Sequence, residues 1–141
     1  EDGASTVVTP ELEKLARRAM KNVAARFEES CLAHAARTGD KSGASAVWSL
    51  LVGLKLVVAN TGDCLAVLGR NGQGVVLTCE HMPHIPSEAA LVRAGGGEVI
   101  EEDGVPSAAK SKGPGMGYLG SRLTRAFGNP DMKPVLTAIP S

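Results

Sequence analysis

One carboxylate at the end of an apolar run is the side chain best placed to do chemistry. Residues 57–61 form a largely β-branched stretch that stops at Gly62, and Asp63 follows directly. Hard divalent cations take carboxylate oxygens as ligands, but they need about six oxygens, so one carboxylate cannot hold such an ion. An Asp after Gly also commonly satisfies backbone donors in a tight turn. Asp63 is therefore predicted to be either one ligand of a metal site that other segments complete, or a turn residue only.

A second group of possible metal ligands lies further along the chain. Glu80, His81 and His84 have a spacing that can converge on one ion. Pro83 and Pro86 act against this, because the two prolines stiffen the segment into an extended course that scatters the side chains. The sequence favours a structural or substrate-facing segment here over a separate metal site.

Four short segments carry a resemblance to a known family through their order and separation. They read Ser42-Gly43-Ala44-Ser45-Ala46, Ala59-Asn60-Thr61-Gly62-Asp63, Thr78-Cys79-Glu80-His81-Met82-Pro83 and Thr124-Arg125-Ala126-Phe127-Gly128-Asn129. Together they resemble the metal-dependent protein serine/threonine phosphatases of type 2C, whose segments run roughly Ser-Gly-Ser-Thr-Ala, Ala-Asn-x-Gly-Asp-Ser, Thr-x-Asp-His-x-Pro and Ser-Arg-Ala-x-Gly-Asp. The resemblance covers about residues 10 to 140.

This resemblance implies a fold and an activity. The expected fold class is α+β, an antiparallel β-sandwich flanked by helices, of which this chain is the central part. The implied activity is dephosphorylation of phosphoproteins, in which two Mg²⁺ or Mn²⁺ ions hold a water that attacks phosphorus in line. Asp63 falls on an aspartate that helps bind a third, weaker ion. The flap beside the family's active site is represented by His81, Pro83, Glu88, Gly95 and Gly96.

The sequence also departs from the family pattern. The main metal-binding segments, Asp-Gly-His-Gly-Gly near the start and Asp-Gly and Gly-Asp-Asn near the end, do not occur. Glu80 and Asn129 stand where the family has Asp, and Thr124 where it has Ser. We therefore expect no catalytic residue, no tight metal binding and no activity in this chain alone. It is either a portion of an active hydrolase or a pseudophosphatase, a non-catalytic binding or structural module within a larger assembly.

Composition narrows the possible partners. Fifteen basic and fifteen acidic residues cancel, which argues against nucleic acid as a partner. No uninterrupted apolar stretch of about 18 residues occurs, so membrane insertion is not expected. Three cysteines without Cys-x-x-Cys spacing favour reduced thiols and an intracellular location, cytoplasmic or nuclear. The expected partners are a phosphoprotein substrate, if the protein is catalytic, and a covering protein segment or partner subunit.

The predicted elements form one partial domain over residues 1–141. Thr9-Pro10 begins a helix over 10–38, because Thr is a good N-cap and Pro fits the first helical position. Residues 43–78 are predicted to form a four-stranded antiparallel meander with a hairpin turn at Asn71-Gly72. A flap-like segment over 83–99 contains a helix at 86–94. A flexible loop over 102–117 and a strand and tail over 118–141 complete the chain. Such a half-sandwich exposes an apolar sheet face that something else should cover.

Overall fold

The computed structural model describes residues 9–141, which begin with one long helix, α1 (Pro10–Thr38). The Thr9 side chain caps it by accepting a 3.3 Å hydrogen bond from the Leu12 N–H. Gly39 ends it in the left-handed region, at φ +74°. The predicted helix over 10–38 is confirmed. Its buried residues lie four apart, on one stripe of the helix: Ala16, Met20 and Ala24.

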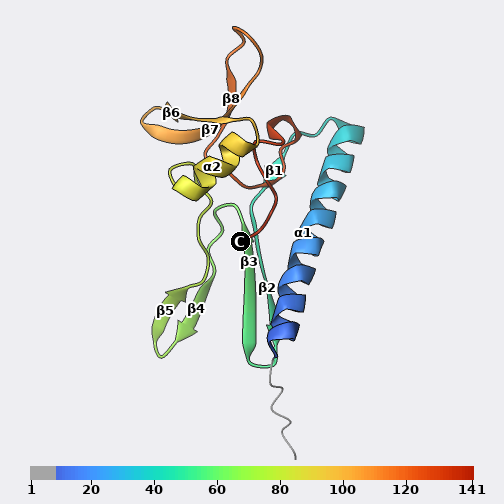
Figure 1. The fold of residues 1–141 in the computed structure, drawn as a ribbon, viewed down its shortest axis with the longest axis vertical. Helices are drawn as coiled ribbons and strands as arrows, with labels where there is room; N and C mark the ends of the chain where they lie inside the picture. The colour runs from blue at the N-terminus through green and yellow to red at the C-terminus, as the bar shows by residue number, and fades with distance from the viewer. Residues whose placement is uncertain (1–8) are drawn as a thin grey trace, which may run out of the picture.

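The buried stripe of α1 packs on a two-stranded antiparallel hairpin. This hairpin consists of β2 (Ala46–Val52) and β3 (Lys55–Thr61). Ala16 and Met20 of α1 form a small core with Val57 and Ala59 of β3, and Trp48 of β2 packs against it. α1 therefore runs alongside the hairpin, as Figure 1 shows.

A second hairpin is formed by β4 (Val67–Arg70) and β5 (Gln73–Val76). Its turn confirms the hairpin predicted at Asn71-Gly72, because both residues have the positive φ that a type I′ turn requires, 52° and 75°. The predicted four-stranded meander over 43–78 is wrong, because β3 and β4 do not pair. The connection between β3 and β4 is instead hydrogen-bonded to Thr78, which follows β5. Thr78 Oγ1 donates to the Cys64 carbonyl at 3.0 Å and accepts from the Ala66 N–H at 3.1 Å.

The predicted flap-like segment over 83–99 contains α2 (Pro86–Ala94) and leads into a three-stranded antiparallel sheet. The strands are β6 (Glu98–Glu102), β7 (Val105–Ser111) and β8 (Tyr118–Ser121), in that order across the sheet. α2 and this sheet lie together at the end of the molecule away from the β4–β5 turn (Figure 1). Their shared core contains buried residues from α2, β7 and the chain after β8: Val92, Ala108, Ala126, Met132, Val135 and Leu136.

The predicted flexible loop over 102–117 is wrong for most of its length. β7 occupies its centre and pairs with β6 on one side and β8 on the other. Ser107, Ala108 and Ala109 are buried, so their small side chains serve close packing rather than mobility. Asp103 and Gly104 form the turn between β6 and β7, with φ of 54° and 76°. Apart from this turn, only the tip between β7 and β8, residues 112–117, lies outside the strands in this segment.

The C-terminal segment connects the part built from α1, β2 and β3 to the part built from α2 and the β6–β8 sheet. β9 (Phe127–Gly128) pairs with β1 (Gly43–Ala44), and the 3-10 turn η1 (Pro130–Met132) follows. A strand was predicted from 118 into this region, but β8 ends at Ser121. The end of the chain then returns to β3 (Figure 1), where Ser141 and Asn60 exchange backbone hydrogen bonds of 3.3 and 3.0 Å. The predicted tail is therefore packed rather than loose.

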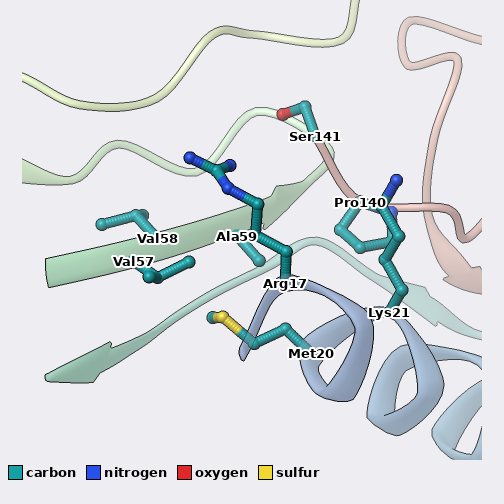
Figure 2. Close-up of a pocket in the computed structure, with 8 residues that line it drawn as sticks. All are labelled: Arg17, Met20, Lys21, Val57, Val58, Ala59, Pro140 and Ser141. Atoms are coloured by element: carbon teal, nitrogen blue, oxygen red, sulfur yellow. The ribbon is translucent and has the colours of Figure 1, made fainter. Parts of the chain in front are cut away.

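A small hollow of about 160 Å³ lies between α1, β3 and the last two residues. Figure 2 shows Arg17 and Met20 projecting from α1 toward β3, and Lys21 beside Pro140. The lining contains apolar β3 side chains and neither Asp63 nor His81. This hollow is therefore separate from the residues that the sequence singled out.

Both hairpins expose apolar side chains. Leu54, at the turn between β2 and β3, is 98% exposed and Leu51 is 68% exposed. Leu65, Val67, Val75 and Val76 are exposed on or beside the second hairpin. Contiguous exposed apolar surface marks interaction sites or causes association. In residues 9–141, no helix is long and apolar enough to cross a membrane.

We expect the 141-residue chain to self-associate through these hairpins. The double variant Leu51→Ser and Leu54→Ser should lower the mass measured by multi-angle light scattering. Its melting temperature should change little, because exposed substitutions usually alter stability by less than about 0.5 kcal/mol. The control is Leu136→Ala, at a position that is 1% exposed. It should cost about 2–5 kcal/mol without reducing association. A wild-type chain that stays monomeric at all concentrations would contradict the expectation.

Candidate functional site

The carboxylate of Asp63 lies in a tight turn at the end of β3. Asn60 is buried at the end of this strand, and its Nδ2 donates to the carbonyls of Gly62 at 3.1 Å and Cys79 at 2.8 Å. Gly62 has a φ of +100°, a backbone conformation that residues other than glycine rarely adopt. A Cβ on Gly62 would lie 2.1 Å from Ser45 Oγ, so glycine is also required for space. The turn therefore places Asp63 next to Ser45.

Ser45 orients the Asp63 side chain. Its hydroxyl donates to Asp63 Oδ1 at 2.8 Å. Ser45 lies between β1 and β2, so this bond joins the first two of the four family-like segments. Asp63 is exposed, and within residues 9–141 its Oδ2 has no hydrogen-bond partner. One carboxylate oxygen is thus held in place, and the other is open to solvent or to a ligand.

His81 binds Gly62 at two points. The Gly62 backbone N–H donates to His81 Nδ1 at 3.0 Å, and the backbone N–H of His81 donates to the Gly62 carbonyl at 3.1 Å. Because Nδ1 accepts, the neutral ring carries its proton on Nε2. The side chain is 2% exposed, and burial, followed by the positive charge of Arg125, lowers the pKa of His81. The imidazole is therefore kept in the neutral form that this hydrogen bond needs.

A buried ion pair holds the next segment against His81. Arg125 Nε and Nη2 donate to the two oxygens of Glu88 at 2.9 and 2.6 Å, and Thr124 Oγ1 donates to Oε2 at 2.6 Å. The Thr124 N–H donates to the His81 carbonyl at 3.0 Å. Burial raises the pKa of Glu88, but hydrogen bonds from Arg125 and Thr124 outweigh it and keep the pKa below its ordinary value. Glu88 therefore stays ionised and connects α2 to His81.

The last family-like segment approaches the first through Gly43. β1 and β9 pair Gly43 with Gly128, and the Asn129 N–H donates to the Ser42 carbonyl at 2.8 Å. A Cβ on Gly43 would lie 2.3 Å from the Asn129 side chain. The uncharged Asn129 thus packs directly on the segment that carries Ser45. Ser45 and His81 contact the Asp63 turn directly, and the last segment is bound to the segments that carry these two residues.

The arrangement offers one hard oxygen ligand rather than a complete metal centre. Within residues 9–141, no three His, Cys, Asp or Glu side chains form a group that could hold an ion. The exposed carboxylate of Asp63 suits Mg²⁺ or Mn²⁺ chemically, but such ions need about six ligands. The residues described therefore fit a contribution to a shared site and do not form that site by themselves.

Comparison with known proteins decides the family. The family model described as protein phosphatase 2C matches residues 4–141. The chain belongs to the protein phosphatase 2C family. "Probable protein phosphatase 2C 78" of Arabidopsis thaliana is 39% identical over 101 residues, 72% of this chain and 22% of that protein. "Probable protein phosphatase 2C 9" of Oryza sativa subsp. japonica is 36% identical over 101 residues, with the same two shares. The chain thus spans about a fifth of the length of these relatives.

Solved structures show the same fold. A serine-threonine phosphatase 2C from Toxoplasma gondii aligns with a TM-score of 0.76 and 22% identity. The alignment covers 98% of this chain and 49% of that one. A C. elegans sex determining protein aligns with a TM-score of 0.73 and 20% identity over 100% of this chain and 31% of the other. The predicted α+β fold class, as part of a larger phosphatase 2C fold, is confirmed.

The residues predicted to form the phosphatase 2C flap occupy structurally distinct places. His81 and Pro83 are buried before α2, and Glu88 is buried within it. Gly95 and Gly96 end the helix; a Cβ on Gly95 would lie 2.6 Å from the Pro134 carbonyl. Glu80 and His84 are exposed and form no metal-binding group with His81. The roles of these residues in a flap, and of Asp63 in metal binding, stay predictions.

Sequence reasoning missed the interactions that connect the phosphatase 2C segments. It treated Thr124-Arg125 as a departure from a motif and did not predict the pairing with Glu88. One signal was available: Glu88 is a charged residue next to Ala89 and four before Val92, and all three are buried on one side of α2. A charge on an apolar helix face needs a partner. Arg125, next to buried Thr124 and Ala126, was a candidate for that role.

Glu88→Gln should destabilise the protein by about 3 kcal/mol at pH 7, because it leaves Arg125 without its buried charge partner. Unfolded Glu88 takes up a proton at its ordinary pKa, whereas folded Glu88 does so only at lower pH. Its stabilisation is therefore complete above the ordinary pKa and lost as pH falls through the native pKa. Urea unfolding at pH 7, 5 and 3 should show the wild type and Glu88→Gln converging in acid. The control, Glu101→Gln, alters an exposed carboxylate; an equal effect there would contradict the assignment.

Gly62→Ala should be far more damaging than Gly72→Ala. Both positions have positive φ, +100° and +75°, but a Cβ on Gly72 meets open space. Gly72→Ala should cost about 1–2 kcal/mol from backbone strain alone. Gly62→Ala should cost about 1–3 kcal/mol more, because its Cβ would overlap Ser45. Chemical denaturation of the two variants measures the difference. Equal losses would show that the Asp63 turn is not tightly packed.

Proposed function

We propose that this chain forms part of a metal-dependent protein serine/threonine phosphatase and contributes Asp63 as one metal ligand. Other segments of the parent protein, or of another chain, supply the remaining ligands. The observation that carries the proposal is the half-satisfied Asp63 carboxylate, which Ser45 fixes at Oδ1 and leaves open at Oδ2. A carboxylate that only satisfied its own turn would bind the backbone N–H groups around it. Its partner here is instead a side chain from a separate strand junction.

The chain's own residues provide binding and orientation. Asp63 offers an oxygen ligand that suits Mg²⁺ or Mn²⁺, and Ser45 limits rotation of its carboxylate. When bound, the metal ions would supply the chemistry, by activating a water for attack on the phosphoryl group. The flap-like segment over 83–99, which contains α2, is the expected contact surface for a phosphoprotein substrate. An intracellular location, cytoplasmic or nuclear, agrees with the substrate class.

A second candidate function is a non-catalytic, phosphatase-like binding or structural module. The exposed apolar hairpins favour it, because Leu51, Leu54 and Val67 present a surface that a partner subunit would bury. The same hairpins agree with the first proposal if further segments of a phosphatase domain cover them. The two functions differ in whether the assembled protein binds metal and turns over substrate.

The decisive experiment replaces Asp63 in the protein that contains this chain together with its completing segments. Asp63→Asn keeps the size and a side-chain acceptor but removes one negative charge from the site. Manganese affinity, measured by isothermal titration calorimetry, and turnover of a phosphothreonine peptide should both fall, with an unchanged melting temperature. The control, Asp103→Asn, removes an exposed carboxylate at the β6–β7 turn and should change neither.

The 141-residue chain alone should show neither calorimetric manganese binding nor hydrolysis of p-nitrophenyl phosphate at millimolar manganese. A manganese-dependent rate that survives repurification and disappears in Asp63→Asn would show that the chain holds a complete centre. Unchanged metal affinity and turnover in the assembled Asp63→Asn protein would reduce Asp63 to a turn residue. An assembled protein that binds no metal would favour the non-catalytic module.

A further inference from the structure

The peptide groups around Gly62 are fixed by one residue from a distant segment. His81 Nδ1 accepts from the Gly62 N–H at 3.0 Å, and the backbone N–H of His81 donates to the Gly62 carbonyl at 3.1 Å. Gly62 is the residue directly before Asp63. Two hydrogen bonds to one glycine fix both its position and its orientation. The direction in which the Asp63 side chain leaves the backbone is therefore set by His81.

The imidazole occupies this place at an energetic cost. His81 Nε2 is buried and has no hydrogen-bond partner within residues 9–141. An unsatisfied buried donor costs about 1–3 kcal/mol, whereas an apolar side chain of similar size would carry no such cost. The imidazole contributes an acceptor at Nδ1 in return, and that acceptor is used on Gly62 alone. The arrangement sacrifices stability for a hydrogen bond at the Asp63 turn.

His81 is itself connected to α2 through Thr124. The His81 carbonyl accepts from the Thr124 N–H at 3.0 Å, and Thr124 Oγ1 donates to Glu88 at 2.6 Å. Arg125 then pairs with the same carboxylate through two nitrogens. A continuous set of hydrogen bonds thus runs from Glu88 on α2 to Gly62. α2 is therefore connected to the Asp63 turn through hydrogen bonds.

We propose that His81 is a positioning residue for Asp63, acting through Gly62 to aim the carboxylate at the metal. The inference rests on the proposed function, because it gives His81 a role only if Asp63 is a ligand. It adds a residue that does not touch the metal. Outer residues of this kind typically change metal affinity about 10- to 100-fold when they are replaced.

The test is a double-mutant cycle between His81 and Asp63 in the metal-binding protein assembled from this chain and its completing segments. His81→Leu removes the acceptor and keeps an apolar filling. His81→Asn keeps an acceptor oxygen near the place of Nδ1. We expect His81→Leu to weaken manganese binding about 10- to 100-fold by calorimetry, and His81→Asn to restore most of it. In the Asp63→Asn background, His81→Leu should weaken binding no further, because the two residues act as one unit.

Nitrogen NMR of His81 in the wild-type assembled protein, without added metal, gives a readout that needs neither metal nor a stable variant. The neutral ring should carry its proton on Nε2, and the Gly62 amide should exchange slowly with solvent. A proton on Nδ1, or rapid exchange at Gly62, would overturn the inference even if His81→Leu fails to fold. Equal losses of affinity from His81→Leu in both backgrounds would also overturn it, since they indicate a general structural role.

The outcomes separate this inference from the function on which it rests. If Asp63→Asn weakens manganese binding and His81→Leu does not, the positioning role is wrong and the metal role of Asp63 stands. If Asp63→Asn leaves manganese affinity unchanged, the metal role is wrong and the positioning role falls with it.

Discussion

The pair of hydrogen bonds between Gly62 and His81 is the constraint on which the rest of the site depends. It joins the end of β3, in the half of the molecule covered by α1, to the segment that leads into α2. The two parts also meet through the β1–β9 pair, the packing of Phe27 on Phe127 and the returning C-terminal chain, but the His81 bonds act directly on the residue before Asp63. The glycine is required because the φ of +100° and the proximity of Ser45 leave no room for a side chain. The position of the exposed Asp63 carboxylate is thus set by the buried residues Gly62 and His81.

Electrostatics supports the same arrangement from the α2 side. The Glu88 carboxylate is 4% exposed, and such a group is tolerated only when its partners replace the lost water. Arg125 and Thr124 do so with three hydrogen bonds. Their benefit is more geometric than energetic, because a buried ion pair often adds little net stability over apolar packing. What it adds here is a fixed distance between α2 and the His81 backbone.

Local signals in the sequence predicted the local structure, and interactions between distant residues explain the errors. Thr9-Pro10 and Asn71-Gly72 act through their own backbone preferences, so the α1 start and the β4–β5 turn were correct. The 102–117 segment was predicted to be a flexible loop, but Ala108 is buried in the same core as Val92 by packing that composition does not encode. The prediction of a four-stranded meander was wrong because the Asp63 turn separates β3 from β4, and the shape of this turn depends on His81. Asp63 itself was found from its position after Gly62, whereas its partner Ser45 depended on tertiary structure.

The central claim is that Asp63 is a metal ligand in a shared phosphatase 2C centre. A crystal structure of the assembled protein grown with Mn²⁺, with anomalous diffraction recorded at the manganese edge, tests it most directly. We expect an anomalous peak within coordination distance of the Asp63 carboxylate, with Oδ1 still accepting from Ser45 and Gly62 still bound to His81. Manganese bound elsewhere, with Asp63 contacting only Ser45 and solvent, would contradict it.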